Sequence, residues 1–311
     1  MLVVGMHRSG TSAVTGALGR LGLQLPAGGD LVTGGYDNPV HYESRALTGF
    51  DDVLMRAIGG SWSSPPLPEE GWEQSAAVRR LIPQAEEAAR RAFPRQGAVA
   101  WKDPRLCLLL PFWRAVLPQP PAVVFVWRQP SAVAGSLRAR QGFTTSLSVA
   151  LWERYNRAAM TTLKGLDTIV LGFEDVVSEP WRAMTAIARW LEGTGRLLRP
   201  VDDVAIETAA ASVSSTLVRR GPTDDAPGFT GQLCKKLAEL DGVHSPFPEV
   251  DVAALPAPPA WADDALSQQR EYEGLYAQYL RYVRWRRRLP MAGWLLRRRR
   301  RGAQSVGDDD A

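Results

Sequence analysis

The chain has 311 residues, of which 45% are hydrophobic, and it carries a formal net charge of +4. This length suits one domain with elaborations, or one domain plus a tail, with enough apolar residues for a large core. The two cysteines and three histidines are too few, and too scattered, for a disulfide framework or a zinc cage, so no metal is expected.

The net charge hides an uneven distribution. Residues 281–301 contain ten arginines and no acid, and subtracting these ten from +4 leaves −6 for the remainder. No secretory signal is visible, and no apolar run approaches the ~20 residues of a membrane span. These features predict a cytoplasmic protein with an acidic body and a basic tail.

Short apolar runs alternate with helix-like stretches along the chain. Strands are expected at 2–5, 98–101, 122–127 and 168–173, and helices after them at about 9–21, 102–117, 131–140 and 179–193. Apolar runs without polar alternation suit parallel strands that are buried on both faces. The sequence therefore predicts an α/β fold, with a doubly wound parallel sheet flanked by helices.

After the first expected helix, an insert of about 75 residues (22–97) precedes the second expected strand, too long for a simple crossover. It includes 34–44, "GGYDNPVHYES", and a helix-like stretch at 73–93, and such long loops commonly build the binding site. The α/β domain is expected over 1–254, followed by a proline-rich linker at 255–264. A helical basic extension at 265–301 and a disordered tail at 302–311 complete the expected organisation.

The stretch 2–14, "LVVGMHRSGTSAV", places a glycine-rich loop between the first strand and the first helix. Gly5 and Gly10 nearly match the phosphate-loop pattern G-x-x-x-x-G-K-[ST], but Thr11 replaces the lysine. That lysine contacts the β- and γ-phosphates in nucleoside triphosphatases, so its absence argues against such an enzyme. The loop suits a nucleotide with a terminal 5′-phosphate group and no triphosphate-bound magnesium.

The segment "GMHRSGTS" resembles the 5′-phosphosulfate loop of bacterial-type sulfotransferases that use 3′-phosphoadenosine 5′-phosphosulfate (PAPS). In that family the loop often reads [K/R]-S-G-T-[S/T]. The resemblance covers roughly residues 2–230 and implies a P-loop-NTPase-like sulfotransferase fold, with PAPS as cosubstrate. It assigns the 5′-phosphosulfate to the matching residues, which are Arg8, Ser9, Gly10, Thr11 and Ser12.

A second motif of the same family lies in "VWRQPSAVAGS". Family members bind the 3′-phosphate of PAPS with an arginine at a strand end and a serine eight positions later. Arg128 and Ser136 have this spacing, with Pro130 between them. An arginine gives a two-pronged contact to a phosphate, and the serine adds a hydroxyl donor. A weaker likeness assigns Arg219 and Arg220 to the segment that closes over the nucleotide, although an exposed basic turn fits them equally well.

Sulfuryl transfer also requires cations near the leaving oxygen and a base for the acceptor proton. Lys102 is the expected second cation beside Arg8, the alternative being a strand-end lysine paired with Asp103. Glu43 is the preferred base, followed by His41 and Asp103. Two alternatives remain: Glu43 as a helix N-terminal acid and His41 as a loop histidine without a role. Nearby aromatics, none of them assigned, are Trp62, Trp72, Trp152 and Tyr155.

The arginine-rich segment 281–301 leaves three interpretations open. It could lie against an anionic membrane at the inner face of the plasma membrane, bind a nucleic acid or acidic polymer, or be a solvated tail. Specific nucleic-acid binding is not expected. The sequence thus predicts a PAPS-dependent sulfotransferase acting on a hydroxyl or amine, with a glycan or glycolipid favoured. The alternatives are a magnesium-dependent P-loop kinase or NTPase and a non-catalytic nucleotide- or polyanion-binding protein.

Overall fold

The computed structural model describes residues 1–33, 40–95, 97–196, 200–213 and 228–287. The chain divides into two compact units, Met1–Leu266 and Ser267–Ala311, here named unit 1 and unit 2. Unit 1 contains the sheet. The described part of unit 2 belongs to one long helix, α12 (Ala260–Arg287), which begins inside the stretch that the sequence suggested as a linker.

Unit 1 is built on a five-stranded sheet with the strand order β4-β1-β5-β6-β7. The strands are β1 (Leu2–Val4), β4 (Trp101–Lys102), β5 (Val123–Trp127), β6 (Thr168–Gly172) and β7 (Gly242–His244). Strands β4, β1, β5 and β6 are parallel, and β7 is an antiparallel edge strand. The predicted α/β class is therefore confirmed, with β7 as an addition. Strand β4 lies on one side of β1 and β5 on the other, so the strand order reverses at β1. In open α/β sheets, ligands bind at the carboxyl ends of the strands beside such a reversal.

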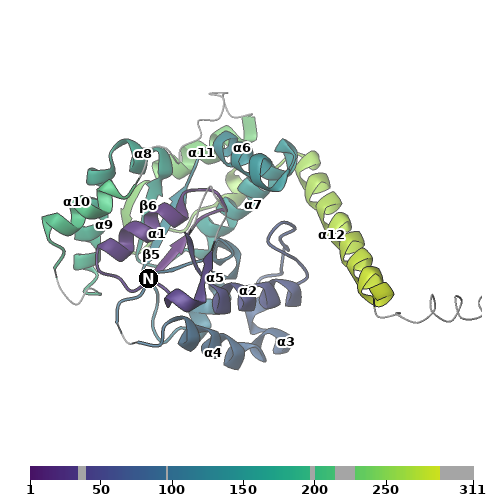
Figure 1. Cartoon of the computed structure of the whole chain (residues 1–311). Helices are drawn as coiled ribbons and strands as arrows, with labels where there is room; N and C mark the ends of the chain where they lie inside the picture. Colours follow the sequence, from purple (N-terminus) through teal and green to yellow (C-terminus); the bar gives the residue numbers. More distant parts are fainter. Residues whose placement is uncertain (34–39, 96, 197–199, 214–227, 288–311) are drawn as a thin grey trace, which may run out of the picture. The chain divides into compact units, whose positions relative to one another are not determined.

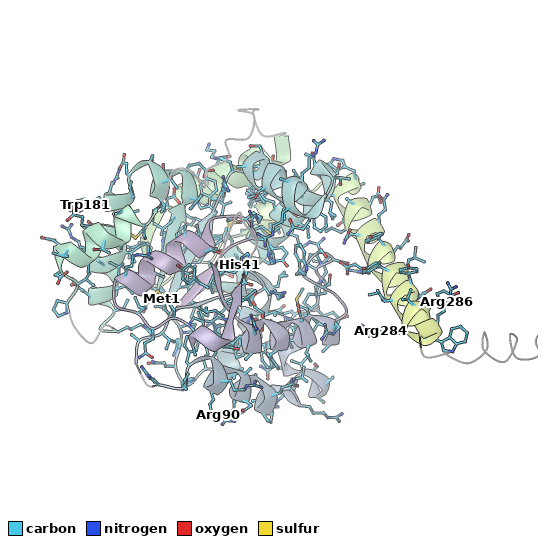
Figure 2. The ribbon with its side chains drawn as sticks, viewed as in Figure 1. Met1, His41, Arg90, Trp181, Arg284 and Arg286 are labelled. Carbon is cyan, nitrogen blue, oxygen red and sulfur yellow. The ribbon has the colours of Figure 1, made fainter. Side chains whose placement is uncertain are left out.

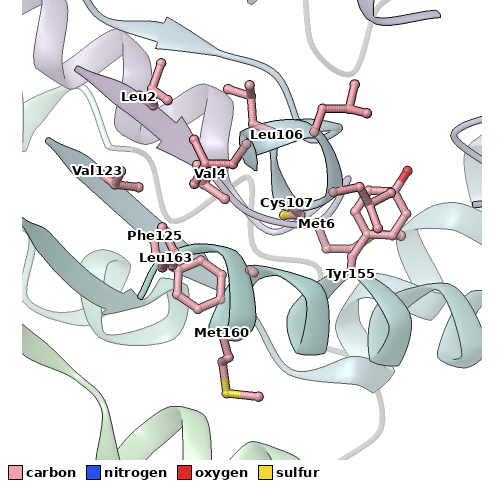
Figure 3. Packing of buried hydrophobic residues seen from close by; sticks show 14 of the residues in the cluster. Leu2, Val4, Met6, Leu106, Cys107, Val123, Phe125, Tyr155, Met160 and Leu163 are labelled. Carbon is pink, nitrogen blue, oxygen red and sulfur yellow. The ribbon is translucent and has the colours of Figure 1, made fainter. Parts of the chain in front are cut away.

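Successive side chains of the inner strands enter two separate cores. Leu2 and Val4 join one core together with Phe125, as Figure 3 shows, whereas Val3 and Val124 join the other. This alternation follows from the two-residue period of a strand. Both faces are buried, which explains why β1 and β5 are unbroken apolar runs in the sequence.

Helices cover both faces of the sheet (Figure 1). The first core takes side chains from α2 (Arg45–Ala57), α3 (Ala76–Arg79), α4 (Ile82–Ala92), α5 (Leu106–Val116), α6 (Pro130–Gln141), α7 (Thr145–Thr162) and α11 (Gly228–Glu239). The second core takes them from α1 (Thr11–Arg20), α8 (Phe173–Ser178), α9 (Pro180–Gly193) and α10 (Asp203–Ala211). The sheet is thus doubly wound, as the sequence predicted.

The long insert between β1 and β4 folds into more pieces than its sequence suggested. It opens with the 3-10 turn η1 (Gly28–Asp30) and an antiparallel ribbon of β2 (Leu31–Thr33) and β3 (Val40–Ser44). The helix-like stretch at 73–93 is divided into the 3-10 turn η2 (Trp72–Gln74), α3 and α4. Ser75 caps α3 and Pro83 stands in the first turn of α4, so each helix starts anew. A last 3-10 turn, η4 (Val252–Ala254), precedes α12.

A proline inside α5 is accommodated by a neighbouring hydroxyl. Pro111 has no N–H, so it cannot donate a helical hydrogen bond to the carbonyl oxygen of Cys107. The hydroxyl of Thr162, in α7, donates to that oxygen at 3.2 Å. The buried carbonyl is therefore satisfied across the α5–α7 contact, which ties these two helices together.

None of the helices within the described residues is both long and apolar enough to cross a membrane.

Candidate functional site

The loop between β1 and α1 requires glycine at both of its ends. A Cβ atom at Gly5 would lie 2.2 Å from the carbonyl oxygen of Val126, because the backbone of β5 passes directly beside it. Gly10 has a φ of +87°, and a Cβ atom there would lie 2.0 Å from the ring of Phe173. The two glycines of the sequence motif are thus fixed by close packing at the carboxyl edge of the sheet.

We expect Gly10→Ala to lower the free energy of unfolding by about 2 kcal/mol or more, because the new methyl group meets Phe173 in a left-handed conformation. Urea denaturation measures this change. Gly49→Ala is the matched control, since nothing lies within 4 Å of a Cβ atom at that helical position. An unfolding free energy for Gly10→Ala equal to that of the wild type would show that the loop tolerates a side chain.

The first candidate functional residue of the loop is Arg8, whose backbone has a φ of +70°. A positive φ is uncommon for a residue with a side chain and persists only where the surrounding structure enforces it. The Nε atom of Arg8 donates a hydrogen bond of 2.7 Å to the hydroxyl of Ser136. The loop thereby aims its guanidinium group at α6, where the second sequence motif lies.

Arg128 directly follows β5 and contacts the backbone of the same loop. Its Nη1 atom donates to the carbonyl oxygen of Arg8 at 3.1 Å, and its guanidinium carbon lies 5.2 Å from the ring centroid of Phe173. Glu174 lies 3.7 Å from Nε, and only 4% of Arg128 is exposed. Burial lowers the pKa of Arg128, with Glu174 opposing this shift and Arg8 adding to it. A guanidinium group fixed in this way can make a two-pronged contact with an anionic group.

Ser136 is placed by the geometry of α6. Pro130 occupies the first turn of this helix, where a missing N–H costs nothing. Two turns later, Ser136 faces the loop and is buried. The structure therefore brings together Arg8, Arg128 and Ser136, which the sequence had assigned to opposite ends of one nucleotide.

The N-terminus of α1 adds backbone donors beside this cluster. The cap residue Gly10 has no side chain that could accept their hydrogen bonds, and Thr11 and Ser12 open the helix. The first N–H groups of a helix lack intrahelical partners and carry its positive dipole end, a combination that binds anions. The hydroxyl oxygen of Ser9 is buried and has no hydrogen-bond partner among the described residues.

Glu43 and Lys102 form an ion pair at the same edge of the sheet. Lys102 ends β4 and is 2% exposed, and its Nζ atom donates a hydrogen bond to Glu43 Oε1. Glu43 immediately precedes Ser44, the cap of α2. Burial alone would raise the pKa of Glu43, but the charge and hydrogen bond of Lys102, helped by Arg105, lower it. Glu43 is therefore a carboxylate at neutral pH.

Asp103, the third candidate for the base, is committed elsewhere. It is fully buried, and both the backbone N–H of Arg105 and its Nη1 atom donate to Oδ1, at 2.8 and 3.0 Å. Arg105 also contacts Asp52 at 2.9 Å. Lys102 pairs with Glu43 and not with its sequence neighbour Asp103. This arrangement indicates that Asp103 and Arg105 anchor the start of α5.

His41 lies in β3, two residues before Glu43, and is labelled in Figure 2. Its Nε2 atom is 3.1 Å from Nη2 of Arg140, at the end of α6. Burial lowers the pKa of His41; Glu43 opposes this shift, while Lys102 and Arg140 add to it. The imidazole is thus neutral at neutral pH, and its contact with Arg140 links β3 to the helix that carries Ser136.

Sequence reasoning missed His7, which lies inside the loop beside Arg8. Its ring is 4.6 Å from the ring of Trp62 and 5.8 Å from that of Tyr155. Its Nε2 atom is buried and has no hydrogen-bond partner within the described parts of the chain. Burial, with Arg105, Lys102 and Arg8 nearby, places the pKa of His7 well below its ordinary value. A neutral ring with an unused nitrogen therefore borders the candidate site. In the sequence, the only sign of this was the position of His7 inside the segment "GMHRSGTS".

The remaining residues considered in the sequence are the second arginine pair and the aromatic side chains. Arg219 and Arg220 lie outside the described residues, so the structure does not place them. Trp152 and Tyr155 are fully buried, and their polar atoms bond to the carbonyl oxygens of Arg128 and Trp62. In the described part of the chain, no group of three or more histidine, cysteine or acidic side chains could hold a metal ion.

No protein-family model matches the chain, and no curated protein matches it. The chain is similar to the solved sulfotransferase domain of the olefin synthase of Synechococcus PCC 7002, with 16% identity and a TM-score of 0.42. That likeness covers 86% of this chain and 92% of the other. It is also similar to a sulfotransferase domain of the curacin biosynthetic pathway, with 14% identity, a TM-score of 0.41, and coverage of 86% and 96%.

Proposed function

We propose that the chain transfers the sulfuryl group of PAPS to a hydroxyl or amine of an acceptor. The observation that carries this proposal is the contact of Arg8 with Ser136 and of Arg128 with the carbonyl oxygen of Arg8. It joins two sequence motifs 120 residues or more apart. A nucleotide with phosphate groups at both its 5′ and its 3′ positions requires two cationic sites of this kind at one sheet edge.

The charges in the site suit the two ends of such a nucleotide. Arg8, the N–H groups at the start of α1 and the hydroxyl of Ser9 would hold the 5′-phosphosulfate. Arg128 and Ser136 would hold the 3′-phosphate, as a guanidinium fork with an added hydroxyl donor. The absence of a lysine after Gly10 fits a ligand that does not carry a triphosphate.

The bound cosubstrate would supply an activated sulfuryl group, whose sulfur bonds to the acceptor oxygen as its bond to the phosphate oxygen breaks. Arg8 and Lys102 would stabilise the negative charge that develops on that phosphate oxygen. Glu43 would accept the acceptor proton, since it is ionised and already oriented by Lys102. The contact between His41 and Arg140 would hold the β2–β3 ribbon against α6, beside the acceptor.

The acceptor that we favour is a glycan or glycolipid. Trp62 is half-buried, and its ring stacks on Phe143 with their centroids 5.6 Å apart, beside His7. Flat aromatic faces next to polar groups suit the apolar faces of sugar rings. Radiolabelled sulfate from PAPS should therefore enter a sugar-containing lipid extract. Labelling of simple phenols but never of sugars would overturn this assignment.

The competing function, a P-loop kinase or NTPase, would need magnesium, whereas the proposed sulfotransferase would not. In such an enzyme Lys102 would take the place of the missing P-loop lysine. Our account predicts that 3′,5′-ADP, the product of PAPS, binds equally well in EDTA and in Mg²⁺, because Arg8 and Arg128 supply the positive charge. Isothermal titration calorimetry measures both affinities, with ATP as the control nucleotide. Magnesium-dependent ATP binding, together with no binding of 3′,5′-ADP, would favour the kinase.

A further inference from the structure

The described helix of unit 2 carries a continuous row of exposed aromatic and apolar side chains. Their spacing places them on one side of α12. This row, named the tyrosine stripe here, consists of Tyr272, Leu275, Tyr276, Tyr279 and Tyr282. Each of the five is between 51% and 65% exposed. Neighbouring rings along the row lie 6.2 and 6.5 Å apart, so the stripe is one apolar surface of a kind that marks an interaction site.

The C-terminal end of the same helix is basic, with four arginines and no acid from Arg281 to Arg287. Residues 267–287 contain five arginines and two glutamates, and 288–301 add six more arginines and no acid. Figure 2 labels two of these arginines, Arg284 and Arg286, near the end of α12. Trp285 continues the aromatic surface, with its ring 6.1 Å from that of Tyr282. Aromatic and basic groups therefore occur together over the last turns of the helix.

From this combination we infer that the tyrosine stripe is a docking surface for an anionic lipid bilayer, with α12 lying in the plane of the interface. Tyrosine and tryptophan favour the boundary between lipid head groups and acyl chains, and arginines beside them meet the negative head groups. A second copy of the chain fits less well, because it would bring two strongly basic segments together. The inference extends the possible contact at 281–301 to a described helix and is independent of the sulfotransferase proposal.

The test is cosedimentation of the full chain with vesicles of equal parts phosphatidylcholine and phosphatidylglycerol, compared with phosphatidylcholine alone. Binding should be at least about tenfold stronger to the anionic vesicles and should weaken with salt. The variant Tyr272→Ser/Tyr276→Ser/Tyr279→Ser should lose about tenfold in binding. The control Ala277→Ser changes the same helix on the side opposite the stripe and should bind like the wild type.

Other outcomes would contradict the inference. One is equal binding by the stripe variant and the wild type; another is no binding of the wild type to anionic vesicles. A chain that ends after Arg287 tests the tail: if it loses all binding while the stripe variant keeps it, the arginines beyond the helix are the anchor. Concentration-dependent self-association that the stripe variant abolishes, without vesicle binding, would assign the surface to a second copy.

Discussion

Replacing Arg128 with alanine is expected to weaken the binding of 3′,5′-ADP by roughly a hundredfold. The buried guanidinium group is assigned to the 3′-phosphate, and a charge-assisted hydrogen-bonded contact of this kind contributes about 1.5–3 kcal/mol. The same group also holds the carbonyl oxygen of Arg8. Its loss therefore removes a ligand contact and loosens the loop. Titration calorimetry of the variant, checked by circular dichroism for an intact fold, measures the effect.

Two further variants separate the role of Arg128 from general charge effects. Arg182→Ala removes an exposed arginine of α9 that forms an ion pair with Glu179, and it should bind the nucleotide like the wild type. Arg128→Lys keeps the charge but loses the planar guanidinium group, so its affinity for 3′,5′-ADP should lie between that of the wild type and that of Arg128→Ala. If Arg128→Ala is folded and binds 3′,5′-ADP as well as the wild type, the 3′-phosphate assignment is wrong.

The second large effect concerns Glu43. The variant Glu43→Gln should transfer sulfate about 10²- to 10⁴-fold more slowly, because an amide cannot accept the acceptor proton. Its affinity for 3′,5′-ADP should stay within about twofold of the wild type, since Glu43 is not assigned to the nucleotide. The side chain also keeps an oxygen that can accept the hydrogen bond of Lys102. Label transferred from radioactive PAPS to an acceptor extract gives the rate, and calorimetry gives the affinity.

Histidine variants serve as controls for the identity of the base. His41→Gln should slow transfer far less than Glu43→Gln, because the imidazole contacts Arg140. His7→Gln tests the neutral ring inside the loop, whose Nε2 atom is buried. Normal transfer by Glu43→Gln together with loss of transfer in His7→Gln would move the proton-accepting role to His7.

The fold could be predicted from the sequence because both faces of the sheet are buried. Each apolar run that the sequence offered as a strand lies within or beside β1, β4, β5 or β6, since residues buried on both faces leave a strong local signal. The antiparallel strand β7 gave no such signal: it has three residues and is largely exposed. The division of residues 73–93 into separate helices depends on capping residues such as Ser75, whose effect on the sequence pattern is local and easily overlooked.

The candidate site could be predicted from the sequence only where its residues form a local motif. Arg8, Arg128 and Ser136 were identified by spacing, and the structure brings them together. The pairing of Lys102 with Glu43, 59 positions apart, could not be read from the sequence, because the tertiary fold determines which charges meet. His7 was overlooked because no motif assigns it a role, and its buried nitrogen is visible only in three dimensions.

The central claim is that one sheet edge binds a nucleotide with phosphates at both its 5′ and 3′ positions. Calorimetric titration of the wild-type chain with 3′,5′-ADP and with 5′-AMP tests it most directly. Our account predicts that 3′,5′-ADP binds more tightly by roughly a hundredfold, and that Arg128→Ala abolishes this preference. Equal affinity for the two nucleotides, or no binding of 3′,5′-ADP at millimolar concentration, would contradict it.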